Sequence, residues 1–169
     1  MRRLLATAAL AAAVLANPSH AQTRTDTTSF QVKLTITESC DIHTTAATEV
    51  NFGSRARTAA AVSIGATGSV TVNCSPNTGY NIGLDGGSNA SVTPGPGDRR
   101  MKGTNNGALV PYDLYQDAAN TVFWGNSTGS LVSGSGTGSN QVYQVHGLLT
   151  SLNFGADVYA DTVTATISY

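Results

Sequence analysis

The chain has 169 residues, of which 11% are charged and 40% are hydrophobic, and its formal net charge is −1. This length suits one domain with a sizeable core rather than two full domains. A nucleic-acid-binding protein needs a concentrated basic surface, and a slightly acidic chain does not provide one, so we expect no nucleic-acid partner.

The N-terminus has the pattern of a secretory signal peptide. Two arginines are followed by an apolar run over residues 4–16 and then by small residues that end at Ala21. This run is too short to span a membrane, and no later stretch approaches 18 apolar residues. We therefore expect residues 1–21 to be a signal peptide cleaved after Ala21, and the mature chain to be exported through the periplasm.

The chain contains two cysteines, Cys40 and Cys74. In an exported protein, two thiols with no third partner most simply form one disulfide, and two free buried cysteines are the alternative. A zinc site needs more ligands, and neither His43 nor His146 has a finger-like spacing from the cysteines. We expect no metal.

The N-terminal part of the mature chain shows the clearest strand pattern. After a polar leader over residues 22–29, apolar side chains occupy every second position, which is typical of a half-buried strand. The same parity continues through Cys40 and Ile42. The alternating apolar residues are Phe30, Val32, Leu34 and Ile36.

Shorter alternating runs follow, and they predict about seven or eight strands in total with no convincing helix. Residues 86–107 are expected to form a long surface connection that contains a solvated charged turn at 98–102, and residues 133–140 a flexible Gly/Ser loop. The other strands are expected near residues 50–52, 69–74, 80–84, 109–115, 142–149 and 159–169, and residues 122–125 form a short apolar stretch. Short strands separated by turn signals indicate an all-β, immunoglobulin-like sandwich.

No pattern in the chain favours catalysis. His43 and His146 are far apart and belong to no paired metal or acid–base motif, so loop or surface positions are favoured for both. The Gly-rich stretch at 134–138 lacks the ending of a phosphate-binding loop. Trp124 and the tyrosines are better explained as core residues than as a sugar-binding platform. We predict no cofactor and no catalytic residue.

Several motifs, taken in order, carry a resemblance that covers essentially the whole mature chain. They are FQVKLTI at 30–36 before Cys40, VTVNC at 70–74, YNIGLDGG at 80–87, RRM at 99–101, LYQD at 114–117, WG at 124–125, VY at 142–143 and YADTVT at 159–164 before Tyr169. Together they resemble the spore coat protein U domain family, which includes the Csu-type pilins of archaic chaperone-usher pili. The YADTVT motif is the most specific of them.

The resemblance implies an immunoglobulin-like sandwich that lacks its last strand and leaves an apolar groove open. In such pilins a periplasmic chaperone fills the groove, and at the outer-membrane usher the N-terminal strand of the next subunit replaces the chaperone. Residues 22–36 would then hold the donor strand, with Phe30, Val32, Leu34 and Ile36 as its inserted side chains, and residues 37–169 would form the pilin domain. The groove edge would be the last strand, with Val163, Ala165, Ile167 and Tyr169.

The sequence therefore predicts a structural, non-enzymatic subunit of a surface pilus, built head-to-tail from identical or related subunits by donor-strand complementation and active in adhesion and biofilm formation. A tip adhesin or a soluble secreted carbohydrate-binding sandwich is the alternative. A tip adhesin needs no donor strand, whereas this chain has a candidate for one at residues 30–36.

Overall fold

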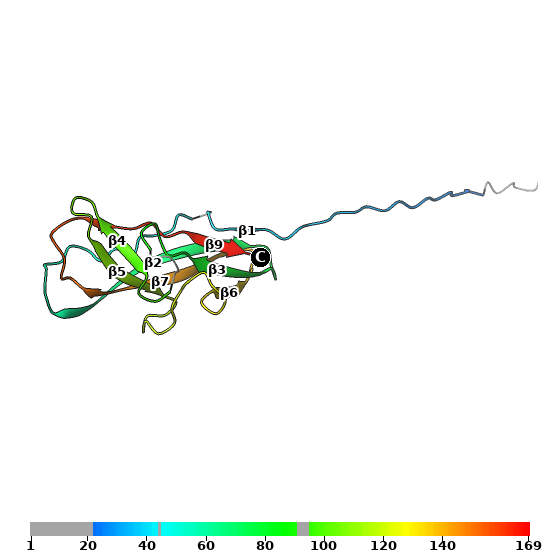
Figure 1. Ribbon diagram of the computed structural model, residues 1–169. Coiled ribbons are helices and arrows are strands. Elements are labelled where there is room, and N and C mark those ends of the chain that lie inside the picture. The colour runs from blue at the N-terminus through cyan, green and yellow to red at the C-terminus, as the bar shows by residue number, and fades with distance from the viewer. Residues whose placement is uncertain (1–21, 44, 91–94) are drawn as a thin grey trace, which may run out of the picture. The chain divides into compact units, whose positions relative to one another are not determined.

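The computed structural model describes residues 22–169 except residues 44 and 91–94. The predicted signal peptide, residues 1–21, lies outside the described residues. The chain divides into two units, residues 1–35 and 36–169. The described part of the first unit contains neither helix nor strand (Figure 1).

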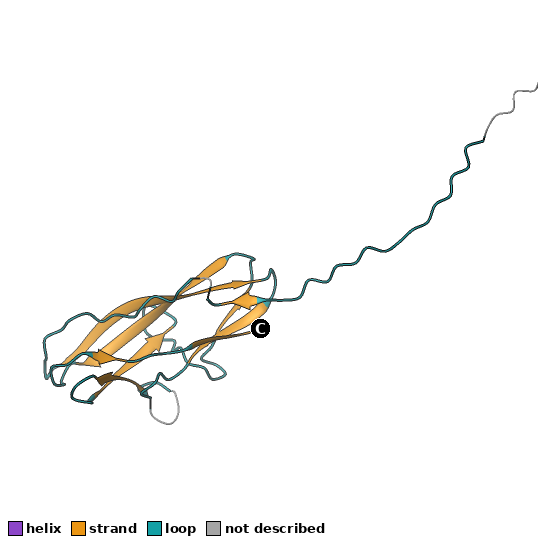
Figure 2. Cartoon of the chain, turned by 90° about the horizontal axis from the view of Figure 1, so that it is seen from above, coloured by secondary structure: helices purple, strands orange, loops and turns teal. Residues whose placement is uncertain are grey.

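The second unit is built from strands and loops, and its described residues contain no helix (Figure 2). No helix that is long and apolar enough to cross a membrane occurs at residues 22–169 outside the two gaps. The strands are β1 (Cys40–Asp41), β2 (Ala61–Cys74), β3 (Gly79–Leu84), β4 (Arg99–Gly103), β5 (Leu109–Tyr115), β6 (Val132–Ser135), β7 (Asn140–Ser151), β8 (Tyr159–Ala160) and β9 (Ala165–Ser168).

The strands form two antiparallel sheets. One sheet has the order β1-β2-β7-β5-β4-β8, and the other has the order β6-β3-β9. The long pair β2 and β7 lies at the centre of the first sheet, and β9, red in Figure 1, pairs with β3 in the second. The fold is an all-β, immunoglobulin-like sandwich, which confirms the fold class expected from the strand pattern.

Period-two alternation places one face of each long strand in a shared core. The core combines side chains from β2, β5 and β7 of the first sheet with Tyr80, Ile82 and Leu84 of β3. Ala165 and Ile167 of β9 pack against it and are half-buried. The largest fully buried side chain among the described residues is that of Trp124, whose indole N–H donates to the Ile82 carbonyl at 3.0 Å.

A disulfide joins Cys40 to Cys74, as expected. The two cysteines are also register partners in the β1–β2 pair, so the bridge fastens the start of the domain to the end of its longest strand. Closing a loop with a sequence separation of 34 stabilises the fold by roughly 3 to 4 kcal/mol in the chain-entropy model.

The prediction of a solvated turn at residues 98–102 is wrong, because most of this segment belongs to strand β4. Arg99 is fully buried, and its guanidinium donates to the carbonyls of Leu84, Asp85 and Trp124 at 2.8–3.0 Å. It also lies 5.1 Å from the centre of the Phe123 ring. Burial lowers the pKa of Arg99, but the carbonyls solvate its charge.

Three further expectations differ from the structure. The alternating run at 30–36 is not a strand in the single chain, because no described segment pairs with it. The expected loop at 133–140 contains most of β6, which pairs with β3, and the first residue of β7. The last strand is divided into β8 and β9, because the residues between them bond to the loop after β3.

Candidate functional site

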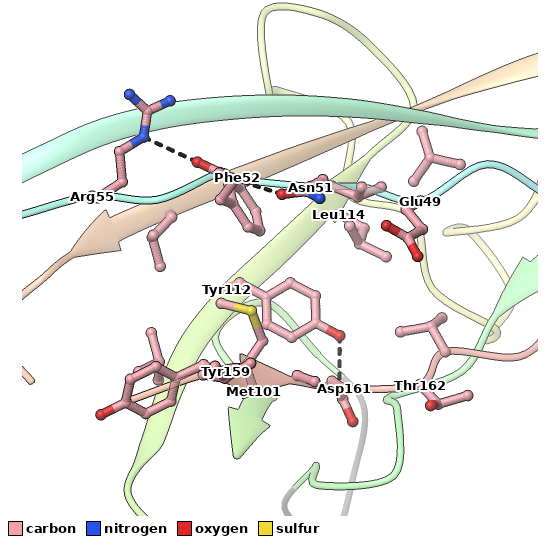
Figure 3. Close-up of a pocket in the computed structure, with 18 of the residues that line it drawn as sticks. Glu49, Asn51, Phe52, Arg55, Met101, Tyr112, Leu114, Tyr159, Asp161 and Thr162 are labelled. Atoms are coloured by element: carbon pink, nitrogen blue, oxygen red, sulfur yellow. Dashed lines mark hydrogen bonds between the residues drawn. The ribbon is translucent and has the colours of Figure 1, made fainter. Parts of the chain in front are cut away.

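A long groove opens in the described part of the second unit, between two stretches of chain that are distant in sequence (Figure 3). We call residues 47–57 the first wall and residues 158–165 the second wall. The cavity between them has a volume of about 1040 Å³. Its floor is mainly apolar and consists of Val70, Leu84, Met101, Val110, Tyr112, Leu114, Val145 and Leu149.

The first wall is held against the first sheet by close packing. Thr48 N–H donates to the Ser69 carbonyl at 3.0 Å, and the two hydroxyls also bond at 3.0 Å. Two glycines permit this approach: a Cβ atom at Gly68 would collide with the Thr48 carbonyl, and one at Gly147 would collide with the side chains of Val50 and Phe52. The wall is therefore fixed in position although it contains no regular strand.

The second wall is held from its outer side by the loop after β3. Ser88 N–H donates to the Thr162 carbonyl, and Asp85 N–H donates to the Thr164 carbonyl, both at 3.0 Å. The Asp85 carboxylate accepts a hydrogen bond from Thr164 N–H at 2.9 Å. Residues 162 and 164 thus direct their main-chain groups away from the groove.

In an extended strand, successive residues direct their N–H and C=O groups to opposite edges. The main-chain groups of Thr162 and Thr164 face the β3 side. The main-chain groups of Val163, Ala165 and Ile167 therefore face the opposite edge. That edge has no strand partner among the described residues. We call these main-chain groups the open edge, and an added strand would pair with them.

A hydrogen bond crosses from the groove floor to the second wall. The Tyr112 hydroxyl donates to Asp161 Oδ2 at 2.8 Å (Figure 3). Asn89 Nδ2 donates to Asp161 Oδ1, also at 2.8 Å. Burial raises the pKa of the Tyr112 phenol far above its usual value, and the hydrogen bond to Asp161 adds to this. Tyr112 therefore remains protonated and acts as the donor, and the Asp161 carboxylate is satisfied in place.

The groove continues into a second cavity of about 440 Å³. The two cavities share Ala47, Val70, Val163 and Ala165. Beyond these, the second cavity is lined by Ile42, His43, Thr45, Ala46 and Thr164. The groove thus extends along the first wall and the segment before it, and its shape fits an extended peptide rather than a compact ligand.

The residues predicted for the groove edge occupy different environments. Val163 and Ala165 line both cavities. Ile167 is half-buried and packs against the core, whereas Tyr169 is 61% exposed and lines neither cavity.

The residues predicted for the donor strand are strongly exposed. The side chains of Phe30, Val32, Leu34 and Ile36 are between 82% and 86% exposed. Four large apolar side chains on alternate positions are thus exposed together, and exposing them to water is unfavourable.

The sequence did not predict most of the first wall or the hydrogen bond between Tyr112 and Asp161. The signal for the wall was the pair Val50 and Phe52, whose spacing was interpreted as a short strand. Phe52 is indeed buried, and its ring packs edge-on against Tyr112 at 6.5 Å. No group of three or more His, Cys, Asp or Glu side chains with metal-binding geometry occurs among the residues the structure describes.

The fold and the groove define a class of protein: an immunoglobulin-like sandwich with one edge open to a further strand. Residues 26–166 match the family model described as Spore Coat Protein U domain, and the chain belongs to this family. It is also 31% identical over 174 residues to Protein U of Myxococcus xanthus, a match that covers 96% of this chain and 95% of that protein.

A solved structure shows the same fold. It is the CsuC–CsuE chaperone–tip adhesion subunit pre-assembly complex from the archaic chaperone-usher Csu pili of Acinetobacter baumannii. The match has a TM-score of 0.56 and 25% sequence identity, and it covers 80% of this chain. The chain spans 41% of the solved chain that it matches, which is less than half of that chain's length.

Proposed function

We propose that this chain is a structural, non-enzymatic subunit of a surface pilus and that it polymerises head-to-tail by donor-strand complementation. One observation carries the proposal: the same chain has an apolar groove with an open main-chain edge and a separate, exposed segment of alternating apolar residues. Each feature is unfavourable in isolation, and each fits the other when they belong to neighbouring copies.

The donor segment supplies both parts of strand addition. Its main chain pairs with the open edge, and Phe30, Val32, Leu34 and Ile36 insert into the groove while the residues between them face outward. Burying four such side chains contributes roughly 6 to 12 kcal/mol before ordering costs. Because the groove and the donor segment are separate surfaces, the contact does not close on itself and builds a fibre.

The proposal includes the route of assembly. A periplasmic chaperone holds the subunit with its groove filled, and the outer-membrane usher exchanges the chaperone for the next donor segment. The similar solved structure, a chaperone bound to a pilus subunit before assembly, supports a chaperone partner. We also propose that the chain is exported after loss of residues 1–21 and is located on the cell surface. There it would take part in adhesion and biofilm formation.

The test is Leu34→Asp. A carboxylate in the groove would have to be buried without a partner, so we expect this variant to be captured by its chaperone but to form no polymers. Thr35→Asp is the matched control, since position 35 faces outward in the proposed complex and should leave assembly intact. Normal fibres from Leu34→Asp, seen by electron microscopy, would contradict the assignment of the donor segment.

Size-exclusion chromatography of the mature chain, with and without the chaperone, separates this function from a soluble sugar-binding sandwich. A stable one-to-one complex supports the pilus subunit. A lone monomer that binds no chaperone and never polymerises supports the soluble alternative.

A further inference from the structure

Three acidic side chains line the groove, and two of them, Asp157 and Asp161, already accept hydrogen bonds from neighbouring residues. Glu49 belongs to the first wall, and Figure 3 shows its carboxylate directed toward the opposite wall. Glu49 is exposed, and its carboxylate has no hydrogen-bond or ion-pair partner among the described residues. By contrast, Arg55 on the same wall directs its guanidinium away from the groove, and its Nε donates to the Phe52 carbonyl at 3.0 Å (Figure 3).

The proposed donor segment carries one charge. Lys33 is the only charged residue between Phe30 and Ile36, and it is exposed. Since the apolar residues on either side of it insert into the groove, the Lys33 side chain must point outward, toward the rim. The outward face of the donor segment is otherwise neutral, with Gln31 and Thr35.

The two charges occupy corresponding positions. Residues 42, 43 and 45–57 contain the lining of one side of the two cavities, and Glu49 lies near the middle of this stretch. Lys33 lies at the middle of the segment from Phe30 to Ile36. A centred donor segment therefore brings Lys33 beside Glu49 whichever way the strand runs.

We propose that Lys33 of one subunit forms an ion pair with Glu49 of the next and that this pair sets the register of the added strand. The inference rests on the proposed function and refines it. A slip of one residue would turn the apolar face outward, so hydrophobicity alone excludes it. A slip of two residues keeps the parity and leaves only one apolar side chain without a pocket, so parity does not exclude it.

Charge discriminates against the two-residue slip. Such a slip moves Lys33 by roughly 6 to 7 Å, which separates it from Glu49. The far end of the first wall offers no acidic partner in place of Glu49, because its charged residues are Arg55 and Arg57. An attractive contact between Lys33 and Glu49 at one position of the strand, with no equivalent contact after the slip, favours a single register.

Carbodiimide cross-linking of wild-type fibres tests the contact directly. The reagent joins a lysine amine to a nearby carboxylate as an amide, and this chain has two lysines, Lys33 and Lys102. We expect mass spectrometry to find Lys33 linked to Glu49 between subunits. Lys33→Arg, which keeps the charge but lacks the reactive amine, should form fibres without this cross-link. Fibres in which Lys33 is linked to a different carboxylate, or to none, would overturn the proposed register.

Charge reversal supplies a second readout. Glu49→Lys and Lys33→Glu should each slow the growth of fibres from chaperone-held subunits by roughly two- to fivefold, as expected for an exposed ion pair. The double variant should regain the wild-type rate. If fibres form but the double variant shows no recovery, the ion pair is refuted and strand addition stands. If the wild-type chain forms no head-to-tail polymer, both proposals fail.

Discussion

Tyr112 on β5 and Asp161 on the second wall are joined by a hydrogen bond of 2.8 Å that ties the groove floor to its rim. Tyr112 is only 7% exposed, and its ring also packs against Phe52 of the first wall. One side chain thus contacts both walls. The width of the groove at this point depends on Tyr112, which makes it a structural determinant of the site.

Tyr112→Phe should destabilise the subunit while keeping the aromatic packing. The change removes the donor to Asp161 Oδ2, and an unsatisfied, partly buried carboxylate oxygen costs about 1 to 3 kcal/mol. Urea denaturation measures this loss in the free energy of unfolding. Tyr169→Phe is the control, because Tyr169 is exposed, and we expect its effect to stay within about 0.5 kcal/mol. Equal free energies of unfolding for the two variants would show that the hydrogen bond between Tyr112 and Asp161 does not stabilise the subunit.

Arg99→Met should be more damaging. It preserves much of the side-chain volume but leaves the carbonyls of Leu84, Asp85 and Trp124 without their donor. Losing a buried charged donor costs about 3 kcal/mol or more. Lys102→Met, at an exposed position on the same strand, is the control and should be nearly neutral. Thermal unfolding followed by the fluorescence of buried Trp124 distinguishes the two variants, and similar melting temperatures would contradict the role of Arg99.

The sequence predicted those strands whose apolar alternation is strong. β3, β5 and most of β7 appear near their expected positions because one face of each is made of large apolar residues. β2 begins well before the expected residue 69. On the inner face of its first half, Val62 and Ile64 are followed by the small residues Ala66 and Gly68, which interrupt the pattern of large apolar side chains.

Tertiary contacts determine what the pattern could not reveal. β4 has a polar sequence, and Arg99 enters the core only because three carbonyls meet its guanidinium there. The first wall has irregular backbone, so no periodicity marks it beyond Val50 and Phe52. The two walls come from opposite ends of the domain, and only the folded chain brings them together.

Acid should weaken the attachment of the segment before β8. The carboxylate of Asp157 accepts hydrogen bonds from the main-chain N–H groups of Asn106 and Asn105, each at 2.8 Å, and these bonds lower its pKa to about 2. A depressed folded-state pKa contributes stability above the unfolded pKa of about 4, and this contribution is lost as the pH falls toward 2.

Asp157→Asn tests this pH dependence. The variant should be less stable than the wild type at pH 7 and should approach it as the pH falls from about 4 to about 2. Urea denaturation across this range measures the difference in the free energy of unfolding. A difference that stays constant with pH would show that ionised Asp157 does not hold the segment.

Ala165→Pro tests whether the open edge is where strands add. Proline lacks an N–H group and is tolerated in an edge strand when that group faces away from the ladder. Ala165 N–H faces the open edge, whereas Thr166 N–H faces β3, as the bonding of Thr164 to Asp85 indicates. We therefore expect Ala165→Pro to fold, with Trp124 buried, and to polymerise roughly two- to tenfold more slowly for the lost hydrogen bond.

Thr166→Pro is the matched control for the opposite edge. It removes a hydrogen bond of the β3–β9 ladder and should impair folding itself, which the fluorescence of Trp124 reports. The comparison separates loss of the domain from loss of assembly, because the two prolines differ by one position and face opposite edges. If Ala165→Pro assembles at the wild-type rate while Thr166→Pro unfolds, main-chain pairing at the open edge is not required and side-chain insertion alone must drive polymerisation.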